Sequence, residues 1–340
     1  DEYAVMVAKN GYSCLRLAGG EHPPDAILLD VTMHGIDGYE VCRRLKADPA
    51  TRNIPVLFIT GQTDAGSEAR GLELGAMDYI TKPFQPLLVK TRVRNQIELK
   101  KHRDQLDLLV HARTAQLSLT QEVTIEAMAA LAEWRDPETG GHIKRTQHYV
   151  RTLAEHMAEL PGYQRILSRN MIEMLYLSAP LHDVGKVSTP DSILFKAGPL
   201  TPEEFEQMKL HTVHGRDLLS AAERRLGSDS FLRIAHDIAY CHHERWDGKG
   251  YPRGIRGEAI PLSARLMSVA DVYDALTSRR VYKPALPHEE VVSIICAGRN
   301  TQFDPDVVDA FIATGETFRD IARRFADEDT LEKALNAPGE

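Results

Sequence analysis

Apolar runs that end in a polar residue characterise the first part of the chain. Three of them are AILLD, which ends at Asp30, PVLFIT, which ends at Thr60, and MDYITKP, which carries Lys82. Helical stretches such as GYEVCRRLKAD and AGSEARGLELG separate these runs. Continuous apolar runs are typical of buried parallel strands, and strands that alternate with helices indicate an α/β sheet. Each polar residue alone could simply end its strand, but the three in order predict one site for an anion and a cation at the carboxyl edge of the sheet.

A long stretch without proline or glycine follows, from about Leu87 to Glu133. Its mixture of charged and apolar residues predicts one long helix or two continuous ones. Apolar residues recur along it at Leu99, Leu106, Leu109, Val110 and Leu117. The heptad pattern is imperfect because His102 and Arg113 fall near inward positions. The helix therefore either forms a dimeric coiled coil or lies on its own domain, and either form can transmit a signal.

The rest of the chain has an all-helical pattern. The sequence LTPEEF places Thr201 at a helix N-cap and Glu204 three residues later, which is the spacing of a capping box. This start predicts a helix that continues through His211 toward Leu219. The sequence PLSARLMSVADVYDAL predicts a further helix that begins near Ser263.

Most of the histidines lie in this helical half, and two adjacent pairs differ from the others. HDVGK begins with His182 and Asp183, and HHERWDGKGYP begins with His242 and His243. Adjacent side chains on a helix diverge by about 100°. That divergence suits two ions with a bridging carboxylate better than it suits one ion. Lone histidines such as His148, His156, His214 and His236 are expected to be ordinary core or surface residues.

Several neutral imidazoles with a few carboxylates suit Fe, Mn, Ni or Zn, whereas Mg²⁺ and Ca²⁺ prefer oxygen ligands. Two such ions, about 3.5–4 Å apart, can hold a hydroxide for in-line attack on phosphorus. The pattern therefore predicts metal-assisted hydrolysis of a phosphoester.

Length and charge narrow the function further. The chain has 340 residues and a formal net charge of −8. This length suits two domains, each able to bury its own core. The negative charge argues against extended binding to a DNA backbone, but it leaves room for a basic pocket around a small anionic nucleotide.

Cysteine usage and the absence of long apolar runs bear on location. The four cysteines form no CxxC pair, so neither a disulfide framework nor a thiolate zinc site is indicated. No apolar run approaches the roughly 18 residues of a membrane span, and the start lacks a signal-peptide pattern. We therefore expect a cytoplasmic protein that has neither DNA nor a membrane as a partner.

The first part of the chain resembles a response-regulator receiver domain, through ILLDVTMHGIDGYE, FIT and DYITKPF. The resemblance implies a doubly wound, flavodoxin-like α/β sheet and a cognate sensor histidine kinase as partner. It makes Asp30 the phosphoacceptor, Thr60 and Lys82 contacts of the phosphoryl group, and Tyr79 the switch aromatic. An intact receiver also holds Mg²⁺.

Two departures from the receiver pattern matter. His34 stands where the family usually has proline, and the acidic pair that helps hold Mg²⁺ is absent. The alternating YAVMVAKNG, near a chain start at Asp1, resembles the family's second strand. We therefore expect that the first strand and helix of the receiver are missing and that Asp30 accepts phosphate poorly in this chain.

The second half resembles the HD-GYP family, the HD phosphohydrolases that degrade cyclic di-GMP. Six stretches occur in the family's order: RDPETGGH, HDVGK, MKLHTVHG, CHHERWDGKGYP, ADVYDALTSRRVYK and FDPDVV. The resemblance implies a dinuclear metal centre, with Asp183 as the bridging ligand. The metal ligands that it implies are His142, His182, Asp183, His211, His242, His243 and Asp271.

The same resemblance assigns further roles. Lys186 binds the scissile phosphate or assists the leaving oxygen, so it joins Asp183 as a catalytic residue. Arg280 and Lys283 contact the phosphates and guanines of the substrate, although they could instead form a solvated basic helix end. Glu138 is a candidate ligand of a third metal. The family motif favours Asp271 over Asp274 as the metal ligand. Tyr251 could stack on a base or pin its own loop, and we favour the second role.

Together these patterns predict a receiver domain (1–90), a helical connector (91–125), an all-helical HD-GYP domain (126–315) and a C-terminal helix and tail (316–340). The predicted function is hydrolysis of cyclic di-GMP to pGpG, and onward to GMP, by two divalent ions, with Fe or Mn favoured over Ni or Zn. Alternatives are a preference for pGpG or another cyclic dinucleotide, and a receptor that binds cyclic di-GMP without hydrolysing it. A homodimer would form through the connector or the receiver. No helix-turn-helix follows the receiver, which argues against a transcription factor.

Overall fold

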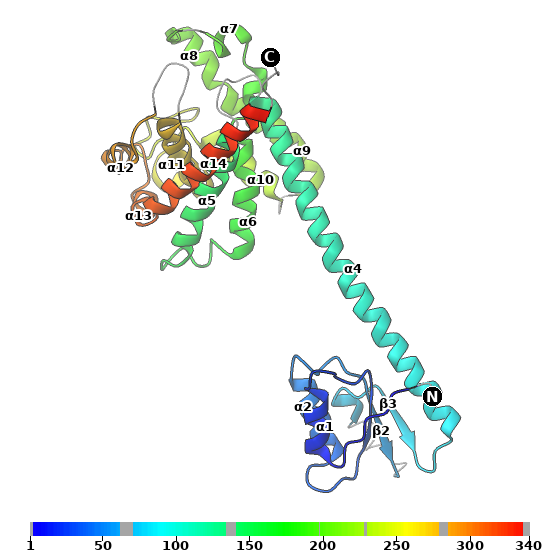
Figure 1. The fold of residues 1–340 in the computed structure, drawn as a ribbon. Helices are drawn as coiled ribbons and strands as arrows, with labels where there is room; N and C mark the ends of the chain where they lie inside the picture. Colours follow the sequence, from blue (N-terminus) through cyan, green and yellow to red (C-terminus); the bar gives the residue numbers. More distant parts are fainter. Residues whose placement is uncertain are drawn as a thin grey trace. The chain divides into compact units, whose positions relative to one another are not determined.

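A computed structural model describes residues 3–61, 71–133, 141–196, 198–227, 230–278 and 285–335. The chain divides into two compact units, Asp1–Leu117 and Ser118–Glu340. The first contains a parallel sheet and the second is helical (Figure 1). The predicted α/β and all-α classes are therefore confirmed. No helix in the described part of the chain is both long enough and apolar enough to cross a membrane.

The sheet of the first unit has three parallel strands in the order β1-β2-β3. The strands are β1 (Ile27–Asp30), β2 (Val56–Thr60) and β3 (Asp78–Thr81), and the helices beside them are α1 (Gly11–Ala18) and α2 (Gly38–Ala47). Asp30 pairs with Ile59, and Thr60 pairs with Thr81. The ends of the three strands therefore meet at one edge, as the apolar runs predict.

The prediction that the segment YAVMVAKNG, residues 3–11, supplies a strand is wrong. These residues form no strand, and the side chains of Val5 and Val7 are 81% and 80% exposed. A strand requires a hydrogen-bonded neighbour, and among the described residues β1 pairs only with β2. The alternating pattern of this segment is therefore not sufficient to make it a strand.

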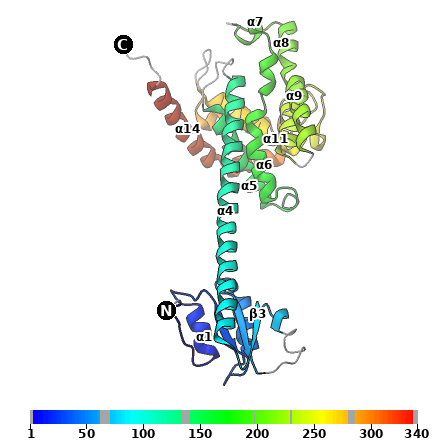
Figure 2. The same cartoon turned by 90° about the vertical axis from the view of Figure 1, so that its right-hand side faces the viewer.

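A single helix, α4 (Pro86–Glu133), begins in the first unit and ends in the second (Figure 1, Figure 2). In the first unit, Arg92 pairs with Asp78 of β3, and Arg103 donates to the Asn53 carbonyl oxygen at 3.0 Å. In the second unit, Ile125 is buried in an apolar cluster. Between these contacts the helix exposes large apolar side chains, namely Leu99, Leu106, Leu108, Leu109, Val110, Leu117 and Leu119.

The second unit consists of helices packed around one main core. Its longer helices are α5 (His142–Ala158), α6 (Arg169–Ser178), α8 (Pro202–Lys209), α9 (His211–Leu226), α10 (Phe231–Cys241), α11 (Leu262–Thr277), α12 (His288–Ala297), α13 (Pro305–Ala313) and α14 (Gly315–Leu335). Helix α11 covers the predicted range from Ser263.

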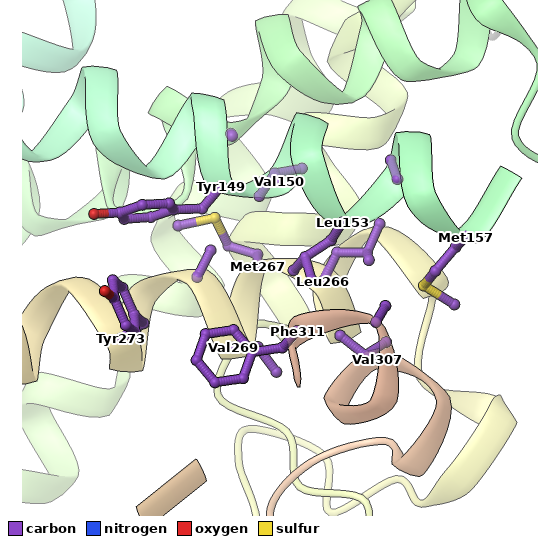
Figure 3. Packing of buried hydrophobic residues seen from close by; sticks show 14 of the residues in the cluster. Tyr149, Val150, Leu153, Met157, Leu266, Met267, Val269, Tyr273, Val307 and Phe311 are labelled. Atoms are coloured by element: carbon purple, nitrogen blue, oxygen red, sulfur yellow. The ribbon is translucent and has the colours of Figure 1, made fainter. Parts of the chain in front are cut away.

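Helices α5, α11 and α13 supply the centre of this core. Leu153 of α5, Leu266 of α11 and Phe311 of α13 are fully buried and lie together (Figure 3). Tyr149 of α5 stacks on Phe318 of α14, with ring centroids 4.5 Å apart. Burying one such side chain contributes about 1.5–3 kcal/mol, so this packing fixes the relative positions of α5 and α11, both of which carry predicted ligands.

The capping box at LTPEEF is confirmed, because Thr201 accepts from the Glu204 amide while the Glu204 carboxylate accepts from the Thr201 amide. The prediction of one helix from there to Leu219 is wrong, since α8 ends at Lys209 and α9 begins at His211. The His211 ring lies 2.7 Å from the Met208 carbonyl oxygen, which a continuous helix would use for its ladder. The break turns His211 inward.

Candidate functional site

The HDVGK sequence forms a tight turn. His182 and Asp183 lie between two 3₁₀ turns, η1 (Ala179–Leu181) and η2 (Val184–Ser188). The prediction that took the two residues to be neighbours on an α-helix is therefore wrong. His182 is fully buried and Asp183 is 9% exposed. A Cβ atom on Gly185 would lie 1.9 Å from the His211 carbonyl oxygen. Glycine is therefore what lets η2 approach the start of α9.

The structure brings the seven predicted metal ligands together in two groups. One group is Asp183, His211, His242 and His243, and the other is His142, His182 and Asp271. Within each group, the nitrogen and oxygen atoms that could bind an ion lie within 4.8 Å of one another. The residues come from five separate places: the starts of α5 and α9, the HDVGK turn, the end of α10 and the middle of α11.

Asp183 lies between the two groups. Its Oδ1 atom is 3.2 Å from His211 Nε2 and 3.6 Å from His242 Nε2, and its Oδ2 atom is 3.4 Å from His182 Nε2. One carboxylate oxygen therefore faces each group. This is the geometry that a bridging carboxylate needs.

Lys186 lies close to the same carboxylate, with its Nζ atom 2.7 Å from Asp183 Oδ2. Burial alone would raise the pKa of Asp183, but the Lys186 ammonium and the His182 ring hold that pKa well below its ordinary value. Burial also lowers the pKa of His182 to about 4. The carboxylate is thus ionised and the imidazole neutral at pH 7, which are the forms that bind metals.

Three of the imidazoles are oriented by main-chain carbonyl groups. The Nδ1 atoms of His182, His211 and His242 lie 3.0, 2.7 and 3.0 Å from the carbonyl oxygens of Ala179, Met208 and Ile238. A donor role for Nδ1 leaves the Nε2 lone pair of each ring directed at the site.

Three of these buried polar atoms form no hydrogen bond within the described part of the chain: Asp183 Oδ1, His211 Nε2 and His242 Nε2. A buried polar atom without a partner costs about 1–3 kcal/mol. A divalent cation among them would satisfy all three at once. The donor set, imidazole nitrogen with carboxylate oxygen, fits a transition metal.

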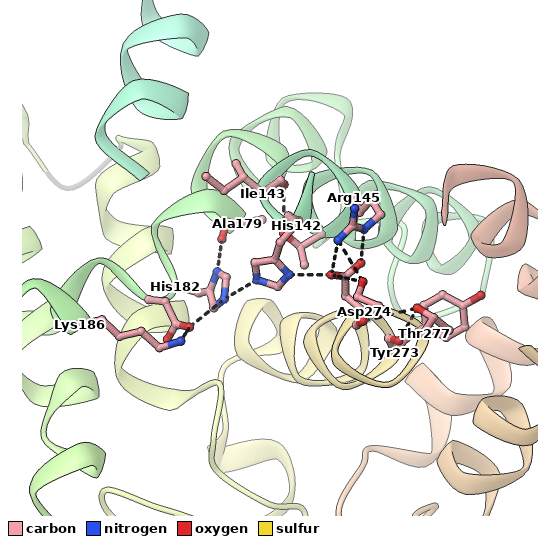
Figure 4. Close-up of polar contacts among 12 residues, drawn as sticks. His142, Ile143, Arg145, Ala179, His182, Lys186, Tyr273, Asp274 and Thr277 are labelled. Carbon is pink, nitrogen blue, oxygen red and sulfur yellow. Dashed lines mark hydrogen bonds and ion pairs between the residues drawn. The ribbon is translucent and has the colours of Figure 1, made fainter. Parts of the chain in front are cut away.

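Asp274 is a site residue whose role the sequence reasoning missed, because it was considered only as a competing ligand. It is 1% exposed and lies 2.8 Å from His142 Nδ1. Arg145 donates to both of its oxygens, at 2.6 and 3.0 Å (Figure 4). The spacing offered a signal, since Asp274 and Arg145 each follow a predicted ligand by three residues and so share its helix face.

The GYP loop folds back onto the second histidine pair. A Cβ atom on Gly250 would lie 2.5 Å from the His243 carbonyl oxygen. The Tyr251 ring packs on the His243 ring with centroids 4.8 Å apart. Tyr251 thus contacts a ligand side chain and its own loop, which agrees with the pinning interpretation. His242, His243, Tyr251 and Asp271 also line a cavity of about 290 Å³.

The predicted receiver residues also lie together. Lys82 Nζ is 2.5 Å from Asp30 Oδ2, and the Thr32 amide donates to the other carboxylate oxygen. Burial by itself would raise the pKa of Asp30, but the hydrogen bond from Lys82 lowers that pKa below its ordinary value. Thr60 is buried at the adjacent strand end, and the Tyr79 ring packs 5.4 Å from the Phe58 ring.

Three predicted residues, Arg280, Lys283 and Glu138, lie outside the described residues. Their proposed roles stay predictions.

Family models match both units. Residues 116–307 match the HD domain, and residues 1–94 match the response regulator receiver domain. The chain belongs to the HD domain family. This HD-domain protein is therefore a response regulator, as the two sets of motifs predict, and HD-domain phosphohydrolases are metal-dependent enzymes.

Relatives of this HD-domain response regulator have names that state activities. A "probable cyclic di-GMP phosphodiesterase" of Vibrio cholerae is 45% identical over 96% of this chain and 76% of the relative. The "cyclic di-GMP phosphodiesterase response regulator RpfG" of Xanthomonas campestris is 36% identical over 89% of this chain and 78% of the relative. A "3'3'-cGAMP-specific phosphodiesterase 2" of Vibrio cholerae is 36% identical over 58% of this chain and 36% of the relative.

Proposed function

We propose that this response regulator hydrolyses cyclic di-GMP to linear pGpG, and pGpG further to GMP, at a dinuclear metal centre. The observation that carries the proposal is the position of Asp183, whose two oxygens face the two ligand groups. The names of the relatives that match most of the chain support the substrate.

The protein's own residues would divide the work as follows. The seven ligands hold two divalent ions, which when bound supply an activated water and polarise the phosphate. Lys186 neutralises the buried Asp183 carboxylate and offers an ammonium group to the scissile phosphate. Arg280 and Lys283 bind the phosphates and guanines, because planar and compact cations both suit a dinucleotide with two phosphates. We propose Fe or Mn as the ions, with Ni and Zn as alternatives, because a set of imidazole and carboxylate ligands accepts several first-row divalent ions.

A second candidate substrate is a different cyclic dinucleotide. The relative named for 3'3'-cGAMP matches the chain over a shorter length than the cyclic di-GMP relatives do. The ligand set itself does not distinguish the bases. Preference for linear pGpG is the other enzymatic alternative, and a non-hydrolysing receptor is the alternative outside catalysis.

The test is an anaerobic time course with Fe²⁺ or Mn²⁺, in which cyclic di-GMP, 3'3'-cGAMP and pGpG are supplied separately. Chromatography resolves the nucleotides, and bound metal is counted in parallel. We expect loss of cyclic di-GMP with pGpG and then GMP appearing. If 3'3'-cGAMP or pGpG were lost faster than cyclic di-GMP, that nucleotide would be the preferred substrate instead. No turnover of any of them, by protein that holds two metals per chain, would favour the receptor.

Replacing Arg280 with alanine is expected to raise KM for cyclic di-GMP roughly 10- to 100-fold with little change in kcat. The reason is that a hydrogen bond to a charged group contributes about 1.5–3 kcal/mol, and uniform binding of substrate and transition state affects KM alone. Initial rates across a substrate series measure this, with Arg225→Ala on the exposed face of α9 as the control. An unchanged KM would mean that Arg280 does not bind the substrate and is instead part of a solvated basic helix end.

For regulation, we propose that Asp30 is the residue that a sensor kinase phosphorylates in an intact receiver, and that α4 forms the contact between two copies of the chain. The exposed leucines between residues 99 and 119 support the second point, because exposed apolar patches mark interaction surfaces. Light scattering should give a dimer mass for the wild type. The double variant Leu106→Glu, Leu117→Glu should give half that mass, whereas Leu218→Glu on α9 should not change it. A monomeric wild type would refute the contact.

A further inference from the structure

The ring of His142 is supported differently from the rings of His182, His211 and His242. The Nδ1 atoms of His182, His211 and His242 face neutral main-chain carbonyl oxygens. The Nδ1 atom of His142 faces the carboxylate of Asp274, and its Nε2 atom points into the site, 3.3 Å from His182 Nε2 (Figure 4). A charged group therefore orients His142, and neutral groups orient the rings of His182, His211 and His242.

Asp274 is itself held firmly. Arg145 forms a two-point contact with it, from Nε to Oδ1 and from Nη2 to Oδ2, and Ser278 Oγ lies 3.3 Å from Oδ2. Both partners of the ion pair are nearly buried, with side chains 4% and 2% exposed. His142 and Arg145 lie three residues apart on α5, so one face of that helix brings both to the same carboxylate.

We propose that Asp274 is a positioning residue that sets the metal affinity of one group, His142, His182 and Asp271. The group that contains Asp183, His211, His242 and His243 is not expected to depend on it. This inference rests on the proposed dinuclear centre. It adds that the two metal positions differ in the residue that controls them.

The physical argument concerns the imidazole ring. A carboxylate that accepts from Nδ1–H fixes the tautomer in which Nε2 carries the free lone pair, and it makes that nitrogen a stronger donor to a metal. Losing such an outer partner typically lowers metal affinity about 10- to 100-fold. His142 belongs to only one of the two groups, so a weaker His142 acts directly on that metal position and not on the other.

Arg145 has a separate part in this arrangement. A buried carboxylate without a counter-charge is costly, and the planar guanidinium both neutralises Asp274 and fixes its orientation through two parallel bonds. The pair thus lets a charged carboxylate support His142 inside the core. Removing the Asp274 charge alone would leave the buried Arg145 guanidinium without that counter-charge, although Arg145 Nη2 also donates to Ser278 Oγ at 3.0 Å. The test therefore needs a second variant.

The experiment is a Mn²⁺ titration of the intact chain, with bound metal counted at each free concentration. Wild type should bind two ions per chain. Asp274→Asn should keep one ion at wild-type affinity and bind the other about 10- to 100-fold more weakly. The double variant Arg145→Gln, Asp274→Asn removes both charges of the buried ion pair and should show the same loss of affinity at one metal position.

The matched control is Asp304→Asn, because Asp304 is also buried and paired with an arginine, Arg265, but is not among the residues of either ligand group. It should lower stability and leave both affinities unchanged. If both Mn²⁺ affinities stayed at the wild-type value in the single and in the double Asp274 variant, the positioning role of Asp274 would be overturned. A wild type that binds fewer than two ions would instead overturn the dinuclear centre on which the inference rests.

Discussion

Turnover of cyclic di-GMP should fall by at least about 1,000-fold, or roughly 4 kcal/mol in the barrier, when Asp183 is replaced by asparagine. Asparagine keeps one carbonyl oxygen, but it presents an NH₂ group where the second carboxylate oxygen faces the other ligand group. It also leaves Lys186, 2.7 Å away, without its counter-charge. The lost carboxylate oxygen and the lost negative charge both belong to the side chain that lies between the two metal positions.

The measurement compares kcat and bound Mn²⁺ in the same preparations. Asp217→Asn is the control, because Asp217 is an exposed aspartate of α9 that pairs with its neighbour Arg216. It should behave as wild type. Wild-type turnover by an Asp183→Asn protein that holds two metals would exclude a bridging role for Asp183.

Gly185→Ala should be the most disruptive single methyl group in the helical unit. The added Cβ would lie 1.9 Å from the His211 carbonyl oxygen and 2.5 Å from the Gly215 amide nitrogen. Both are main-chain atoms, so neither can rotate away. Overpacking of a core typically costs about 1–3 kcal/mol and occasionally more, and here we expect the upper end, with His211 displaced from Asp183.

Urea unfolding of the full chain and a metal count measure this effect together. Gly198→Ala is the matched control, because a Cβ atom there meets nothing within 4 Å. The Gly185 variant should unfold at lower urea and bind less metal, whereas the Gly198 variant should match wild type. Equal stability of the two variants would mean that η2 and α9 are not held in this close contact.

How much of the site could be predicted depends on how local its determinants are. The pairs His182–Asp183 and His242–His243 could be predicted as ligands because each pair is adjacent in the chain and the family motifs carry both pairs. The three-residue spacings place Asp274 and Arg145 each beside a predicted ligand, but they do not pair the two residues with each other, which are 129 positions apart. Their proximity follows from the packing of α5 on α11, which no local pattern encodes.

The fold shows the same division. Buried runs such as PVLFIT predicted strands correctly because their side chains face a core on both sides of the sheet. The alternation at residues 3–9 failed because a strand also depends on a partner outside the segment. The helix break at Leu210 was missed because the helical spacing gives no sign of the contact found there, between the His211 ring and the Met208 carbonyl oxygen.

The use of main-chain carbonyl groups at Ala179, Met208 and Ile238 has a consequence for sequence drift. A carbonyl oxygen is present whichever amino acid occupies the position, so these three sites can change identity, within the limits of packing, while the imidazoles keep their orientation. Position 274 has no such freedom, because only a side chain supplies its oxygen atoms. Divergence should therefore be tolerated beside the rings of His182, His211 and His242 and resisted beside the ring of His142.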